Sequence, residues 1–107
     1  MNILSILGPA PPFELVTSVG GTPMAYQQIT DLSAATGLTY PAGSRVAIVQ
    51  AEDQTVRYRT DGEAPEATVG MTLAPTEQVK LHSFTGDLVN AKFIEEASGG
   101  KLNVTYY

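Results

Sequence analysis

The sequence has no cysteine, no tryptophan and a single histidine among its 107 residues. The absence of cysteine excludes disulfide bonds, thiolate metal sites and cysteine nucleophiles. Because His82 is the one histidine, a single chain cannot build a metal site from several histidine ligands. Basic residues are also scarce, with six Lys and Arg against eleven Asp and Glu, and the net charge of -5 disfavours nucleic-acid binding.

Long apolar runs are missing as well. No stretch approaches the ~20 apolar residues of a membrane span, so we expect no membrane partner. The apolar residues 1–7 follow no basic residue and end at Gly8, which argues against a secretory signal. What is present is 43% hydrophobic residues with only 16% charged residues, against a usual ~25% charged. This balance predicts one folded domain, part of whose surface is covered by something other than water.

Residues 1–25 differ from the rest of the chain and are predicted to form an N-terminal arm. Pro9, Pro11 and Pro12 forbid a helix and disfavour a paired strand. The arm nevertheless carries large apolar side chains, which a plain linker does not need. Those predicted to make contacts are Ile3, Leu4, Ile6, Leu7 and Phe13. Two interpretations stay open: the arm packs on its own domain, or it docks on a neighbouring subunit.

Residues 26–107 are predicted to form the folded domain, with short strands and a turn signal every 8–12 residues, as in a sandwich or barrel. The predicted strands cover residues 27–31, 37–40, 45–51, 55–60, 68–73, 77–82, 88–95 and 101–107. Residues 45–51 are apolar on both faces and are predicted to be central, and one helical turn within residues 30–37 is an alternative for that segment. We expect an all-β, antiparallel β-sandwich, jelly-roll-like, of about eight strands.

The side chains that could carry chemistry favour binding over catalysis. A Ser–His–Asp set lacks any nucleophile motif, and His82 is predicted on the outward face of its strand. Three acidic groups fall at predicted turns, where solvated charge explains them. Arg57 and Arg59 share one strand face. With Lys80 and His82 on another strand, they are predicted either as exposed polar residues or as a positive subunit-interface patch facing acidic partners. We therefore expect no enzyme activity, no cofactor and no metal.

Several short motifs occur in a fixed order along residues 38–107. They are Val56-Arg57-Tyr58-Arg59-Thr60-Asp61-Gly62, the segment 64–71, Phe84-Thr85-Gly86-Asp87-Leu88, Phe93-Ile94 and Leu102-Asn103-Val104-Thr105-Tyr106-Tyr107. The series resembles small β-sandwich structural proteins of tailed bacteriophages, whose pattern is R-x-R-x-D-G-x-x-P-T-A, then a G-D-L turn, then a terminal L-N-V-S-Y-Y. Glu66 replaces the usual Thr, and His82 stands where an aromatic or aliphatic residue is commoner. The first 37 residues do not share the resemblance.

The resemblance implies a capsid decoration (cement) protein without enzyme activity, made in the host cytoplasm and located on the exterior of the virion. The implied partners are the major capsid protein and further copies of the chain, most simply as a homotrimer. The apolar arm and the Arg57/Arg59 face are the candidate contacts. Other open alternatives are a small head, head–tail connector or tail component, and a β-sandwich receptor- or carbohydrate-binding module.

Overall fold

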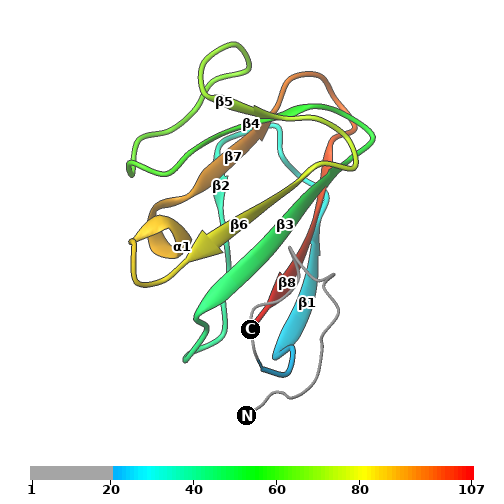
Figure 1. Cartoon of the computed structure of the whole chain (residues 1–107). Coiled ribbons are helices and arrows are strands. Elements are labelled where there is room, and N and C mark those ends of the chain that lie inside the picture. The colour runs from blue at the N-terminus through cyan, green and yellow to red at the C-terminus, as the bar shows by residue number, and fades with distance from the viewer. Residues whose placement is uncertain (1–20) are drawn as a thin grey trace, which may run out of the picture.

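The computed structural model describes residues 21–107, in which eight strands form two four-stranded antiparallel sheets packed as a sandwich (Figure 1). The first sheet contains, in order, β1 (Ala25–Ile29), β8 (Lys101–Tyr106), β3 (Val46–Glu52) and β6 (Gln78–His82). The second sheet contains β2 (Thr36–Gly37), β7 (Lys92–Glu95), β4 (Val56–Arg59) and β5 (Met71–Leu73). A single-turn helix, α1 (Asp87–Asn90), precedes β7. The predicted all-β sandwich of eight strands is confirmed.

The strand pairing is nested around the middle of the domain. β4 pairs with β5, β3 with β6, β2 with β7 and β1 with β8, so the chain forms one long hairpin folded back on itself. Two further pairings, β3 with β8 and β4 with β7, close the hairpin into two sheets. This rolled hairpin is the jelly-roll topology, which confirms the predicted arrangement.

The core lies between the sheets and follows from alternation along the strands. In β8 the inward residues Leu102, Val104 and Tyr106 are all buried, whereas the residues between them are half-exposed. β3 pairs on both sides and is buried along most of its length, so the prediction that this segment is central is correct. In the second sheet, Phe93 is fully buried and stacks on Tyr58 at 5.7 Å between ring centroids.

The predicted strand over residues 88–95 is wrong in its first half. Residues 87–90 form α1, and β7 begins at Lys92. Gly86 adopts φ 82°, a left-handed conformation that turns the chain into the helix, and the Ala91 N–H donates to the Asp87 carbonyl at 2.9 Å. The helical turn buries Leu88 and leaves Val89 exposed, whereas a strand would have placed Val89 on the same face as Ala91.

The segment before β3 also departs from expectation. No helical turn forms within residues 30–37, because Asp31 accepts a hydrogen bond from the Ser33 hydroxyl at 2.9 Å and holds a local turn instead. Leu32 is fully buried beneath this turn. Of the predicted strand over 37–40 only Gly37 is in a strand, because β2 covers Thr36 and Gly37, which pair with Phe93 and Lys92. Whether residues 1–25 form a separate arm stays a prediction, since residues 1–20 lie outside the described part.

Candidate interaction surface

Arg57 and Arg59 lie on the outer face of β4, as the alternation predicts, but each is paired within the chain. Arg57 Nε donates to Glu96 Oε2 at 2.5 Å, and Arg59 contacts Asp61 with two nitrogens, at 3.1 and 2.5 Å. Lys80 and His82 lie on β6, on the outer face of the other sheet, because Leu81 between them is buried in the core. The outer faces of two packed sheets point in opposite directions, so these four residues do not form one positive patch.

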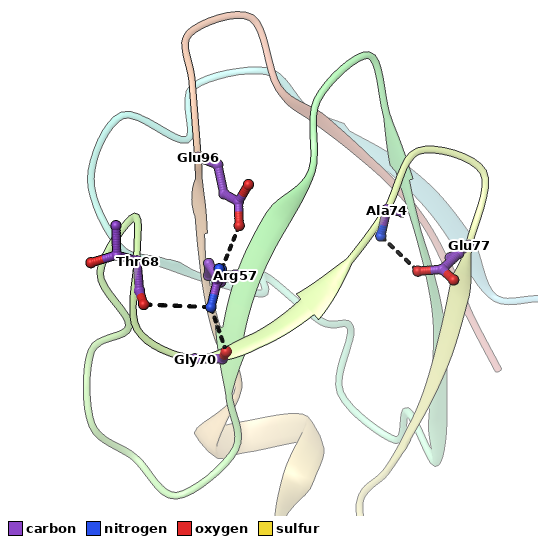
Figure 2. Close-up of polar contacts among 6 residues, drawn as sticks. All are labelled: Arg57, Thr68, Gly70, Ala74, Glu77 and Glu96. Atoms are coloured by element: carbon purple, nitrogen blue, oxygen red, sulfur yellow. Dashed lines mark hydrogen bonds and ion pairs between the residues drawn. The ribbon is translucent and has the colours of Figure 1, made fainter.

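Arg57 joins Glu96, the residue that follows β7, to the connection between β4 and β5 (Figure 2). Besides Glu96, its guanidinium donates to the Gly70 carbonyl at 3.1 Å and to the Thr68 carbonyl at 3.5 Å. The side chains of Arg57 and Glu96 are less than one-third exposed, at 25% and 31%, so the pair is partly shielded from solvent. The planar guanidinium can serve three acceptors at once. Arg57 therefore positions the loop that leads into β5.

The loop itself ends in a tight turn and a close approach. Glu66 and Val69 exchange two backbone hydrogen bonds, at 2.9 and 3.0 Å, across a two-residue turn. Gly70 then adopts φ 139°, and a Cβ at this position would lie 3.0 Å from the Tyr58 carbonyl oxygen. A side chain is therefore excluded at residue 70, and the chain enters β5 pressed against β4.

A shallow hollow, open to solvent, lies between the end of β4 and the start of β5. Its volume is about 350 Å³, and we call it the β4–β5 hollow. Its lining residues are Arg59, Thr60, Asp61, Val69, Gly70 and Met71. The hydrogen bond from Arg59 lowers the pKa of Asp61 and raises the pKa of Arg59, so both stay charged at neutral pH. The hollow thus combines an ion pair with the apolar side chains of Val69 and Met71.

Met71 occupies an inner-face position that the sandwich leaves open. It pairs with Tyr58, and opposed residues of an antiparallel pair share a face of the sheet. Tyr58 stacks on the buried Phe93, yet Met71 is 64% exposed. Leu73, two residues further along β5, is buried. The apolar face of the second sheet is therefore covered at Leu73 and uncovered at Met71.

A second group of exposed apolar side chains lies on the connection between β6 and β7. Phe84 is 83% exposed and Val89, on α1, is 63% exposed. His82 lies beside Phe84, with 5.0 Å between ring centroids. Among residues 21–107 no three His, Cys, Asp or Glu side chains gather closely enough to hold a metal ion. The expected lack of enzyme activity stays a prediction.

The sequence predicted that Arg57 and Arg59 share the outer face of one strand, which is correct, whereas their role as contacts stays a prediction. Sequence reasoning missed Val69, Met71 and Phe84. Phe84 had a visible signal, because a large aromatic residue within the turn Ser83–Gly86 is unlike the polar residues that turns prefer. Met71 gave no such signal in the sequence, since its exposure depends on the packing of the two sheets. The arm residues Ile3, Leu4, Ile6, Leu7 and Phe13 lie outside the described residues.

The fold defines the structural class of this protein, whereas no comparison assigns it to a family. It is a small two-sheet antiparallel β-sandwich with jelly-roll topology. Comparisons of the chain with protein-family models, curated proteins and solved structures find no match. Within the described segment, no helix has the length and apolar character needed to cross a membrane.

Proposed function

We propose that this protein is a non-enzymatic structural component of a tailed-phage virion that binds the outside of the capsid lattice and stabilises it. The observation that carries the proposal is where the phage-like motifs fall in the fold. Arg57 joins three segments, Asp61-Gly62 turns the chain between β4 and β5, and the terminal motif forms β8, which pairs on both sides. The resembling residues are thus those that build this jelly roll.

The architecture agrees with this role at the level of analogy. Eight-stranded jelly rolls occur in viral capsid proteins and also in lectins, so the fold alone leaves the carbohydrate-binding alternative standing. The exposed side chains favour a protein partner. Phe84 and Val89 present apolar surface on a connection, where an aromatic side chain can anchor in a partner's pocket.

The mechanism would be bridging. Each copy contacts more than one capsid subunit, and a homotrimer multiplies weak contacts through effective concentration. The low charged fraction of 16% fits a protein that covers part of its surface in an assembly.

The test uses virions of the phage that encodes the chain, prepared with and without its gene. The expected result is difference density repeated over the capsid exterior, and capsids that rupture at lower temperature when the protein is absent. Density at the portal vertex or the tail would instead identify a connector or tail component. Virions that lack the protein altogether, together with glycan binding in solution, would identify the binding module.

A matched pair of variants then tests the contact surface. Phe84→Ala removes an exposed aromatic anchor, and added back to bare capsids it should bind at least about tenfold more weakly than the unchanged protein. Ser83→Ala, at the neighbouring exposed position, should bind normally. Equal binding by both variants would remove Phe84 from the interface.

A further inference from the structure

The β4–β5 hollow lies at an open strand edge of the described domain. β5 is the last strand of the second sheet, with β4 on one side and no described strand on the other. An edge strand offers unpaired N–H and C=O groups to which an extended segment can add, while a nearby pocket takes a side chain. β5 is short, at three residues, but Met71–Leu73 carries no charge and no proline, two of the devices that block such addition.

The surroundings of the hollow restrict what can occupy it. Val69 and Met71 offer apolar surface, and Met71 lies on the inner face of its sheet, where a core position remains uncovered. The loop beside it carries the exposed carboxylates of Asp61, Glu63 and Glu66. An acidic strand would be repelled there, so the occupant should be extended, apolar and free of negative charge.

One segment of this chain has that chemistry. Residues 1–13 contain no charged side chain. Residues 1–8 precede the prolines and can pair as a strand, while Pro9, Pro11 and Pro12 favour an extended backbone after them. Four aliphatic side chains and Phe13 supply candidates for the hollow. Twenty residues outside the described part can span at most ~66–72 Å, against a radius of gyration of roughly 12 Å for a domain of this size. The segment is thus long enough to reach a neighbouring copy.

The topology favours a neighbour over the same chain. The arm enters the domain at β1, which is the edge of the first sheet furthest from β6. A short connection joins β6 to β5, with the Ala74 N–H donating to Glu77 Oε1 at 2.7 Å (Figure 2). The hollow, at β5, therefore lies at the opposite edge of the sandwich from β1, where the arm joins the domain.

We propose, building on the assembly role above, that the N-terminal segment of one copy adds to the free edge of β5 in the next copy and inserts an apolar side chain into the β4–β5 hollow. The contact joins two different surfaces, so it is heterologous, and three copies related by a three-fold axis close it into a ring. In this arrangement the β4–β5 hollow of one copy binds the predicted arm of the next, and Met71 contacts the inserted apolar side chain.

Disulfide trapping tests the contact directly, because the unchanged chain has no cysteine. Full-length chains carrying Ile3→Cys, Leu7→Cys or Phe13→Cys are mixed with isotope-labelled chains carrying Met71→Cys. The matched control is Val89→Cys, whose position is exposed to the same extent, 63% against 64%. At least one arm cysteine should form an interchain disulfide with residue 71 about tenfold faster than with residue 89, since docking raises the effective concentration.

Three results would overturn the proposal. One is cross-linking at residues 71 and 89 at equal rates, and another is no cross-linking from any arm position. The third is a double variant, such as Phe13→Cys with Met71→Cys, that closes its disulfide within a single chain. Because this assay needs no capsid, its outcome is independent of whether the protein decorates virions.

A second measurement avoids engineered cysteines. Met71→Glu places a carboxylate in the hollow at a largely exposed position, so the variant should fold with an unchanged melting temperature. At a concentration where the unchanged protein sediments as an oligomer, Met71→Glu should approach the monomer mass of 11.3 kDa, and Val89→Glu should remain an oligomer. Retention of the oligomer by Met71→Glu would also contradict the proposal.

Discussion

Tyr106 ends β8 inside the sandwich, with only 1% of its side chain exposed, and its hydroxyl donates to Gln27 Oε1 at 2.6 Å. Gln27 lies on β1, so this bond connects the first strand of the domain to the last. Replacing Tyr106 by Phe keeps the ring and removes the bond. The variant should lose about 1 kcal/mol of unfolding free energy at pH 7, the usual net worth of one such hydrogen bond.

The same hydroxyl predicts a pH dependence whose sign follows from burial. Burial raises the pKa of Tyr106 from 10.0 to about 12, because the phenolate is poorly solvated inside the sandwich. As pH rises above 10, the unfolded chain releases this proton before the folded chain does. The folded state then holds more protons, so stability is fully present below pH 10 and falls between pH 10 and 12. At pH 11 the loss amounts to about 1.4 kcal/mol.

Tyr106→Phe should therefore be the less stable protein at pH 7 and about equal to the unchanged protein near pH 11. Urea unfolding followed by circular dichroism from pH 7 to 11.5 measures both curves, and the remaining tyrosines affect the two proteins alike. Tyr26→Phe is the matched control, because its hydroxyl also donates a hydrogen bond, to Asn103, but from a largely exposed ring. Parallel curves for Tyr106→Phe and the unchanged protein up to pH 11.5 would refute the reasoning.

Three further changes test the packing around the interaction surface, each by urea unfolding. Arg57→Ala should lower the free energy of unfolding by about 1.5–3 kcal/mol, because it leaves Glu96 and two carbonyls without their donor. Arg57→Lys should not restore this stability, since one ammonium group cannot reach all three acceptors. Full rescue by lysine would contradict this. Gly70→Ala should cost about 2 kcal/mol or more, because φ 139° and the Tyr58 carbonyl exclude a Cβ. Phe93→Ala should cost about 3–5 kcal/mol, whereas Phe84→Ala should change stability by less than about 0.5 kcal/mol; similar losses for both would mean that the exposure of Phe84 is wrongly assigned.

The strands were predictable where one local pattern dominates. Val56 to Arg59 and Leu102 to Tyr106 alternate apolar and polar residues. The structure buries all three apolar residues of the second segment, and in the first it buries Val56 and partly buries Tyr58. The turn residues Asp61-Gly62 mark the end of the first alternation, and Ala74-Pro75 mark the end of β5. In residues 88–91, by contrast, apolar residues fit a strand and a helical turn equally well. The left-handed Gly86 and the space for Leu88 decide the outcome, and neither is visible in periodicity.

The interaction surface was less predictable because its features depend on residues far apart in the chain. Arg57 was recognised as outward-facing, but its partner Glu96 is 39 residues away and comes from a loop after β7. Met71 lies on the inner face of its sheet like any core residue, and its exposure depends on where the opposing sheet stops. Alternation assigns a face to a side chain, whereas only the packed sandwich determines whether that face is covered.

The ion pairs of the domain bear on how it can associate. All six Lys and Arg lie within residues 21–107, and three of them, Arg57, Arg59 and Lys101, are held by carboxylates of the same chain. Cations already paired are poorly placed to recruit an acidic partner, and the net charge of -5 makes two copies repel each other at long range. The proposed association would have to overcome that repulsion through exposed apolar side chains and the edge of β5 that no strand of residues 21–107 covers. Association through these groups would need few charges, in agreement with the charged fraction of 16%.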